Sequence, residues 1–184
     1  MRYLLVILLC LTMIEVGCKE STTAPSQADG NLLTNSTFEF NGSPSLQGWV
    51  VSDSSNVRFS TDTPPNGSGR TIVLDAQGFA PWPNGSIYQT VAPPAGTHHY
   101  RLSVFGKRSG VAGFVEVHLG RPSDTVSILR MSLQIPDTVW TFCSLTDTIT
   151  TRTIDSLFIT ISGGGTEMCA GTTFFNTCKF EKLE

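Results

Sequence analysis

The chain has 184 residues, enough for one domain with a proper core but too few for two of ordinary size. Only 15% of the residues are charged, and 17 Gly and 10 Pro accompany many Ser and Thr residues, a balance that favours turns and β-strands over helices and predicts an all-β fold. The formal net charge of −3 comes without any block of Lys or Arg, which argues against a nucleic-acid partner.

The first twenty residues, MRYLLVILLCLTMIEVGCKE, have the layout of a secretory signal, because Arg2 precedes an apolar run that is too short to cross a bilayer. The end of the run, Val16-Gly17-Cys18, resembles the bacterial lipobox, in which the cysteine is lipidated and becomes the first mature residue. Glu15 stands where the lipobox usually has Leu, and an ordinary cleaved signal peptide is the alternative. The resemblance implies a lipoprotein signal peptide over residues 1–17.

The same resemblance implies a place in the bacterial cell envelope, lipid-anchored through Cys18, at the outer membrane if the source has two membranes. Contact with the membrane would then be through the N-terminal lipid alone. Residues 19–30 contain almost nothing apolar and cannot bury enough surface to offset the entropy lost on ordering. We therefore expect a flexible tether over 18–30 and a folded, monomeric domain over 31–184.

Within residues 31–184, short strand-like runs alternate with turn signals at the spacing typical of a β-sandwich or jelly roll. Turn residues such as Asn66-Gly67, Pro93-Pro94 and the glycine run 163–165 separate the runs, and no long stretch has helical periodicity. The predicted strands are 37–41, 47–52, 57–61, 71–75, 86–91, 99–108, 113–120, 125–135, 138–147, 153–161 and 172–182.

Several stretches of this domain follow a known pattern in order and spacing: NLLTNSTFE, LQGW, GSIYQTVAPPAGTHHYRLSVFGK, DTVWTFCSL, SLFITISGGG and TTFFNTCKFEKL. The domain thereby resembles the CenC-like carbohydrate-binding modules of families 4, 9 and 22. This resemblance implies a galactose-binding-domain-like jelly roll over 31–184 that binds a polysaccharide or oligosaccharide on its concave sheet. A structural or adhesion lipoprotein that binds another protein is the alternative, because the same fold also serves that role.

The resemblance also implies a structural calcium ion, with Glu39 and an Asp of the closing strand among its ligands. Asn176 stands in place of that Asp, and an amide in place of a carboxylate lowers the affinity for calcium. The alternative is that Glu39 and Asn176 join the two ends of the domain through hydrogen bonds.

The alternation of side chains along three consecutive predicted strands separates core positions from a mixed outer face. Tyr100, Leu102 and Val104 are expected in the core, as are Leu129 and Met131. The opposite side then carries Arg101, Phe105, Phe114, Glu116, His118, Arg130 and Gln134. Aromatic rings stack on the C–H faces of sugars, and the polar groups bind their hydroxyls, so we predict a carbohydrate-binding face. The alternative is an ordinary solvated side of an antiparallel sheet.

The stretch GFAPWPNG places Trp82 between two prolines, so this residue cannot lie in a helix or a central strand. Trp49 and Trp140 match the family pattern and are expected to be packed, whereas Trp82 matches none of it. With Phe79 and Tyr88, Trp82 is predicted to form a stacking platform for sugar at the rim of the site. The alternative is a Trp folded onto the edge of the sandwich.

Three cysteines lie in the predicted domain, namely Cys143, Cys169 and Cys178. An oxidising compartment predicts one disulfide and one thiol left over. Pairing of Cys169 with Cys178 is disfavoured because an extended segment 172–178 spans about 20 Å, against a limit of about 7 Å between bridged Cα atoms. We expect Cys143 to pair with one of the other two; buried thiols are the alternative.

The sequence has no nucleophile elbow, Gly-rich phosphate loop or His-Glu-x-x-His motif, and His98 and His99 point to opposite faces of one strand. A jelly-roll glycosidase or lyase would need a pair of acids, Glu116 and a loop residue such as Asp75 or Asp124. Glu116 alone does not make that pair, so the expected function is non-catalytic binding.

Overall fold

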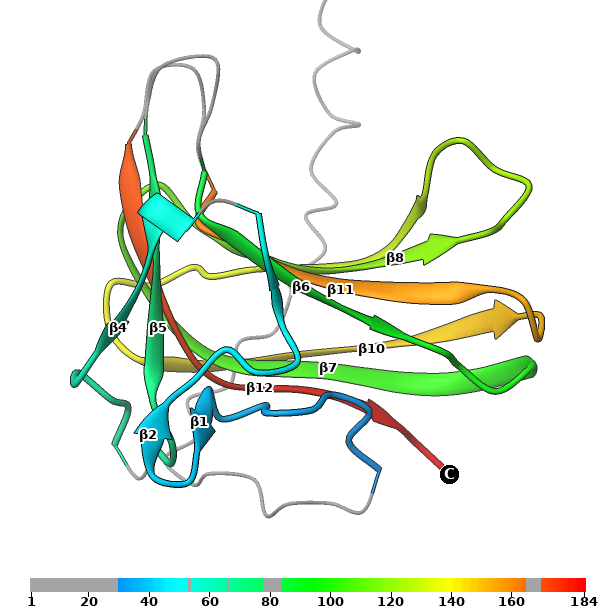
Figure 1. The fold of residues 1–184 in the computed structure, drawn as a ribbon, viewed down its shortest axis with the longest axis horizontal. Coiled ribbons are helices and arrows are strands. Elements are labelled where there is room, and N and C mark those ends of the chain that lie inside the picture. The colour runs from blue at the N-terminus through cyan, green and yellow to red at the C-terminus, as the bar shows by residue number, and fades with distance from the viewer. Residues whose placement is uncertain (1–29, 53, 66, 78–83, 165–169) are drawn as a thin grey trace, which may run out of the picture.

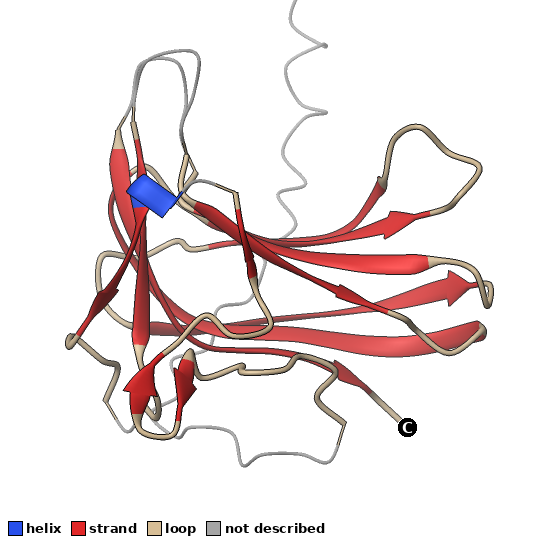
Figure 2. Cartoon of the chain, viewed as in Figure 1, coloured by secondary structure: helices blue, strands red, loops and turns tan. Residues whose placement is uncertain are grey.

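The computed structural model describes residues 30–52, 54–65, 67–77, 84–164 and 170–184. These residues form two five-stranded antiparallel sheets that pack face to face, with a short two-stranded ribbon beside them (Figure 1). The described part of the chain is built of strands and loops apart from the 3-10 turn η1, Ser54–Asn56 (Figure 2). The predicted all-β sandwich is therefore confirmed.

The first sheet has the strand order β10-β7-β12-β5-β4, and the second has the order β3-β6-β11-β8-β9. The first sheet consists of β4 (Val57–Ser60), β5 (Thr71–Ala76), β7 (Gly96–Gly110), β10 (Thr141–Thr151) and β12 (Gly171–Lys182). The second consists of β3 (Val50–Val51), β6 (Ser86–Val91), β8 (Phe114–Gly120), β9 (Ile128–Gln134) and β11 (Ser156–Ser162). The ribbon pairs β1 (Glu39–Phe40) with β2 (Ser43–Pro44).

The core lies between the two sheets and is filled by the inward-facing side chain of every second residue, as a period of two requires. Val115, Val117 and Leu119 of β8 are buried, while the residues between them are half-buried on the other side. From the first sheet, the Tyr100 ring stacks on Phe180 with centroids 5.1 Å apart. Trp49 is buried as predicted, and its indole nitrogen donates to the Asn35 carbonyl at 3.2 Å.

A bulge interrupts the alternation along β12. Its register with β7 shifts between Asn176 and Lys179, and Thr177 has a φ of 49°. The extra residue lets Cys178 face the core, where burial raises the pKa of its thiol to about 12, so this thiol stays protonated and unreactive at neutral pH.

Of the two partners predicted for Cys143, Cys178 is wrong. Cys143 lies opposite Val104 on β10, and Cys178 lies on β12, on the far side of β7. Two strand spacings put their Cα atoms about 9–10 Å apart, beyond the reach of a disulfide. Both side chains are buried, and Cys178 is a free thiol. The other predicted partner, Cys169, lies outside the described residues.

The predicted signal peptide, the lipidation site Cys18 and most of the tether also lie outside the described residues. Within the described ranges, no helix has the length and apolar character needed to span a bilayer.

Candidate functional site

The outer face of the second sheet brings together side chains from four strands, β6, β11, β8 and β9. Tyr88 of β6 lies opposite Thr160 of β11, Thr160 lies opposite Glu116 of β8, and Glu116 lies opposite Ser132 of β9. The neighbouring rows add Phe158 beside His118, and Phe114 beside Gln134. Together these side chains form the binding face: Tyr88, Phe114, Glu116, His118, Ser132, Gln134, Phe158 and Thr160.

A hydrogen-bonded polar cluster occupies the middle of the binding face. The Glu116 carboxylate accepts from Ser132 Oγ at 3.2 Å and contacts His118 Nε2 at 3.3 Å. The side chains of Glu116 and His118 are 28% and 26% exposed, so they are held in place and still reach solvent. A carboxylate fixed in this way keeps lone pairs that can accept from the hydroxyls of a ligand.

Phe158 places an aromatic ring at one end of this cluster. A Cβ built on Gly120 of the adjacent strand would come within 2.4 Å of Phe158 Cε2, so the ring lies directly over the bare glycine backbone. A strand over 153–161 is expected from the sequence, and Phe158 and Thr160 are not among the predicted site residues. In SLFITIS every second residue is aliphatic, and Leu157, Ile159 and Ile161 are buried. Phe158 and Thr160 therefore face outward, which this alternation could have indicated.

The binding face is flanked at both ends. It points upward in Figure 1, where the connection 121–127 rises beside it on the right and the ends of β5 and β12 rise on the left. A cavity of about 440 Å³ opens at the right-hand end. It is lined by Gly120, Arg121, Pro122, Asp124, Val126, Ser127, Ile154, Ser156 and Phe158, so the Phe158 ring belongs both to the binding face and to this end cavity.

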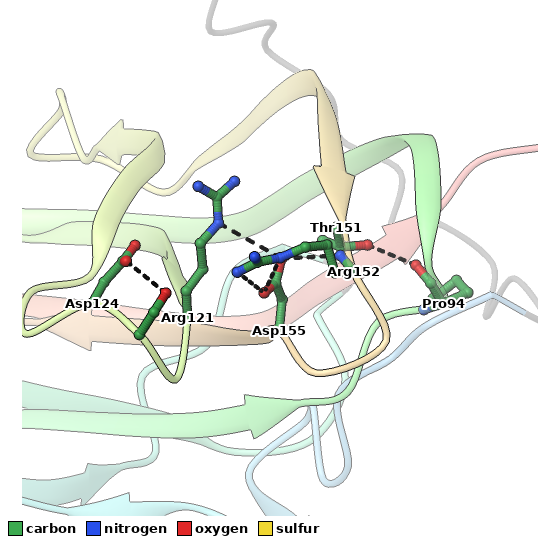
Figure 3. A network of polar contacts seen from close by, with 7 residues as sticks. Pro94, Arg121, Asp124, Thr151, Arg152 and Asp155 are labelled. Atoms are coloured by element: carbon green, nitrogen blue, oxygen red, sulfur yellow. Dashed lines mark hydrogen bonds and ion pairs between the residues drawn. The ribbon is translucent and has the colours of Figure 1, made fainter.

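A buried carboxylate anchors the loops around the end cavity (Figure 3). Arg152 donates to Asp155 Oδ1 from Nε and Nη2, at 3.2 and 3.0 Å, and its backbone N–H donates to Oδ2 at 2.9 Å. The Arg121 Nε lies 3.7 Å from the same Oδ2. The backbone N–H and the guanidinium of Arg152, together with the charge of Arg121, lower the pKa of Asp155 against the opposing effect of burial.

We expect Asp155→Asn to lower the melting temperature by a few degrees at neutral pH, because the ionised carboxylate holds both arginines. Since the pKa of Asp155 is lowered on folding, its stabilisation is present above the ordinary carboxyl pKa of about 4 and is lost as the pH falls through the lowered value. Circular dichroism melts at neutral pH and near pH 3 should therefore show the difference between wild type and variant shrinking with acid. An equal difference at both pH values would show that the charge does not contribute.

The prediction that three consecutive strands share one outer face is wrong. β7 belongs to the first sheet, whereas β8 and β9 belong to the second, because the chain crosses between sheets after Gly110 instead of forming a hairpin. Arg101 therefore lies on the opposite side of the sandwich, where it is paired with Glu181 at 2.8 Å. Phe105 is 3% exposed and packs against Phe142, with ring centroids 5.0 Å apart. Neither residue can contact a ligand on the binding face.

A second bulge displaces Arg130 from the predicted face. The register of β8 with β9 shifts at Val117/His118, so that His118 lies opposite Leu129. Leu129, predicted in the core, is 50% exposed. Arg130 instead reaches across to the first sheet, where it donates to the Thr148 carbonyl at 3.3 Å and lies 3.9 Å from Asp147. Of the predicted face, the structure gathers Phe114, Glu116, His118 and Gln134, together with Tyr88 from the predicted platform.

The other members of the predicted platform, Phe79 and Trp82, lie outside the described residues. Trp140 is half-buried and faces Phe174 edge-on, with ring centroids 6.4 Å apart, and Lys107 lies over both rings. Asp62 pairs with Lys107 and accepts from the Trp140 indole nitrogen; these two hydrogen bonds lower the pKa of Asp62. This aromatic cluster lies on the first sheet, where Asp62, whose side chain is 47% exposed, is held by Lys107 and Trp140.

The residues proposed as calcium ligands have other partners. Glu39 lies 3.7 Å from the guanidinium of Arg70, and the Asn176 side-chain oxygen accepts from Thr177 Oγ1 at 2.7 Å. Among the described residues, no three His, Cys, Asp or Glu side chains form a group that could hold a metal ion. A guanidinium beside the carboxylate disfavours a second cation there, so the arrangement does not fit calcium well. Calcium binding remains a prediction of the sequence alone.

A catalytic alternative would require Asp75 or Asp124 to complete a pair with Glu116. Asp75 lies near the end of β5 in the first sheet, where it is bonded to Arg58 at 3.1 Å and to Thr172 at 2.7 Å. Asp124 lies in the loop that lines the end cavity.

Comparison with solved structures finds the same fold in several carbohydrate-binding modules. No protein-family model and no curated protein matches the sequence. A family 16 carbohydrate-binding module is 17% identical over 84% of this chain and 100% of its own, with a TM-score of 0.56. TmCBM61, solved with β-1,4-galactotriose, is 14% identical over 83% of this chain and 99% of its own, with a TM-score of 0.51.

A phage protein shares the fold as well. The enzymatically active domain of tailspike protein 4 of bacteriophage CBA120 is 12% identical over 83% of this chain, with a TM-score of 0.60, and the match spans 21% of the tailspike chain. At these identities the likeness concerns the fold. The described part of this chain is a β-sandwich jelly roll of the kind found in carbohydrate-binding modules.

Proposed function

We propose that this chain is a non-catalytic carbohydrate-binding lipoprotein of the bacterial cell envelope, anchored through Cys18, which holds a polysaccharide or oligosaccharide on the binding face. The observation that carries the proposal is the half-buried cluster of Glu116, His118 and Ser132 between aromatic side chains. Aromatic rings can pack on the C–H face of a sugar, and fixed polar groups on the same surface can hydrogen-bond to its hydroxyls.

The proposal of binding without catalysis is supported by the acids of the binding face. Glu116 is the carboxylate of this face among the described residues. Asp75 is held by Arg58 on the first sheet, and Asp124 lies in the loop that lines the end cavity, beyond the end of β8. Most glycosidases need two acids on either side of the bond that is cleaved. The solved module with a bound galactotriose supports a saccharide as the ligand class.

Affinity electrophoresis of the full chain through gels containing soluble glucan, xylan, mannan, galactan or pectin tests this function. We expect at least one polymer to retard the wild type, and Glu116→Gln to weaken the affinity by about tenfold, because a hydrogen bond to a charged acceptor contributes roughly 1.5–3 kcal/mol. Asp147→Asn is the matched control, because Asp147 is a half-exposed carboxylate on β10 of the first sheet.

No retardation of the folded wild type in any gel would contradict the proposal. Capture of a protein partner by the same preparation would then favour a structural or adhesion lipoprotein.

A further inference from the structure

The end cavity has the size and composition of a small-ligand site. Its volume of about 440 Å³ lies in the range of roughly 300–1,000 Å³ that such sites occupy. Its apolar walls come from Phe158 and from Val126 and Ile154, which are 74% and 62% exposed. Exposed aliphatic side chains grouped around a cavity are typical of a ligand-binding surface.

Arg121 supplies hydrogen-bond donors to the end cavity, because its guanidinium lies near Asp155 but makes no hydrogen bond to it. Arg152 already bonds both oxygens of Asp155, and Arg121 approaches that carboxylate only through Nε, at 3.7 Å, without a hydrogen bond. Figure 3 shows the two terminal nitrogens of Arg121 pointing away from Asp155. The guanidinium is thus steered by Asp155 while its forked N–H groups stay available to a ligand.

Asp124 supplies the matching acceptor from the same loop. The loop turns sharply, with the Asp124 N–H donating to the Arg121 carbonyl at 2.9 Å. The Asp124 carboxylate accepts from Ser123 Oγ at 3.0 Å and keeps its remaining lone pairs. A guanidinium and a carboxylate of opposite charge, beside an aromatic ring, suit a neutral polyol ring better than an anion.

The position of the end cavity indicates which part of a saccharide it takes. Phe114, Glu116 and His118 follow one another along β8, and the cavity begins where that strand ends, at Gly120. Past the end of β8, the connection 121–127 rises on the right (Figure 1). A saccharide laid along β8 would therefore reach the end cavity with its terminal residue.

We propose that the end cavity is a terminal subsite that holds the last neutral sugar of a glycan, with Arg121 donating to its hydroxyls, Asp124 accepting from them and Phe158 packing on its C–H face. This inference rests on the proposed carbohydrate-binding function and adds that the protein recognises chain ends.

Saturation-transfer difference NMR of the full chain with glucose, galactose, xylose, mannose and arabinose, each tested alone, examines the subsite. We expect at least one of these monosaccharides to bind saturably, and Arg121→Ala or Asp124→Ala to weaken that binding by about tenfold or more, with partial recovery in Arg121→Lys. Arg58→Ala is the matched control, because Arg58 is a 55% exposed arginine that also pairs with an aspartate, on the first sheet.

The absence of a signal from all five monosaccharides, or an equal signal from Arg121→Ala and wild type, would overturn the terminal subsite. If a polymer still retarded the wild type, the proposed carbohydrate-binding function would be retained, but the end cavity would not be part of the site. Monosaccharide binding that requires Arg121, without retardation by any polymer, would keep the subsite and remove the extended binding face.

Discussion

Phe158→Ala is expected to weaken glycan binding by roughly 30-fold, which corresponds to about 2 kcal/mol and to the loss of a central aromatic contact. The ring lies over Gly120 between the polar cluster and the end cavity, so its removal affects both parts of the site. Isothermal titration with the polymer that retards the wild type measures the change. Phe158 is a half-buried residue outside the core, so the melting temperature should fall by little.

Phe40→Ala is the matched control for this experiment. Phe40 is 52% exposed on the short β1–β2 ribbon, away from the second sheet. If both phenylalanine variants bound as tightly as the wild type, the binding face would not be the site.

Phe180→Ala is expected to lower the free energy of unfolding by about 3–5 kcal/mol, the usual result of emptying a large core position. Phe180 is fully buried on the central strand β12 and stacks on Tyr100 at 5.1 Å. Its removal leaves a cavity and a tyrosine hydroxyl that already lacks a partner among the described residues. Urea titration followed by tryptophan fluorescence measures the change.

Phe180→Leu keeps most of the side-chain volume and should cost clearly less than the alanine variant. A loss below about 1 kcal/mol for Phe180→Ala would show that this end of the core collapses without strain, and would contradict the packing described here.

The strands could be predicted from the sequence, because the alternation of apolar and polar residues and the turn-forming residues are local features. The predicted ranges 71–75, 86–91 and 172–182 match β5, β6 and β12 within a residue. The sheet to which each strand belongs could not be predicted from the sequence. The alternation of buried and exposed side chains distinguishes the two faces of a strand, but it looks the same in either sheet. The placement of Arg101 and Phe105 beside Glu116 failed for this reason.

Bulges limited the prediction of the site in a second way. The extra residue Arg130 inverts the alternation between the two sides of the bulge, so Leu129, which precedes it, faces outward. Nothing in VSILRMSLQI marks the position where this happens. Thr177, a β-branched residue at positive φ, is held there by the surrounding structure against its own preference. The end cavity was missed because its walls come from two connections that meet only once both sheets are packed.

The pairing of the first described residues with the last strand also determines how the molecule would carry force. Asn31 bridges to Glu181, and the Leu32 N–H donates to the Phe180 carbonyl at 2.7 Å, on the first sheet. If a lipid held the N-terminus and a glycan pulled on the binding face, the tension would cross the whole sandwich and reach the anchor through this short pairing. This pairing would then be the first contact to break under force, and its rupture would release residues 31 and 32 before the core around Phe180 opened.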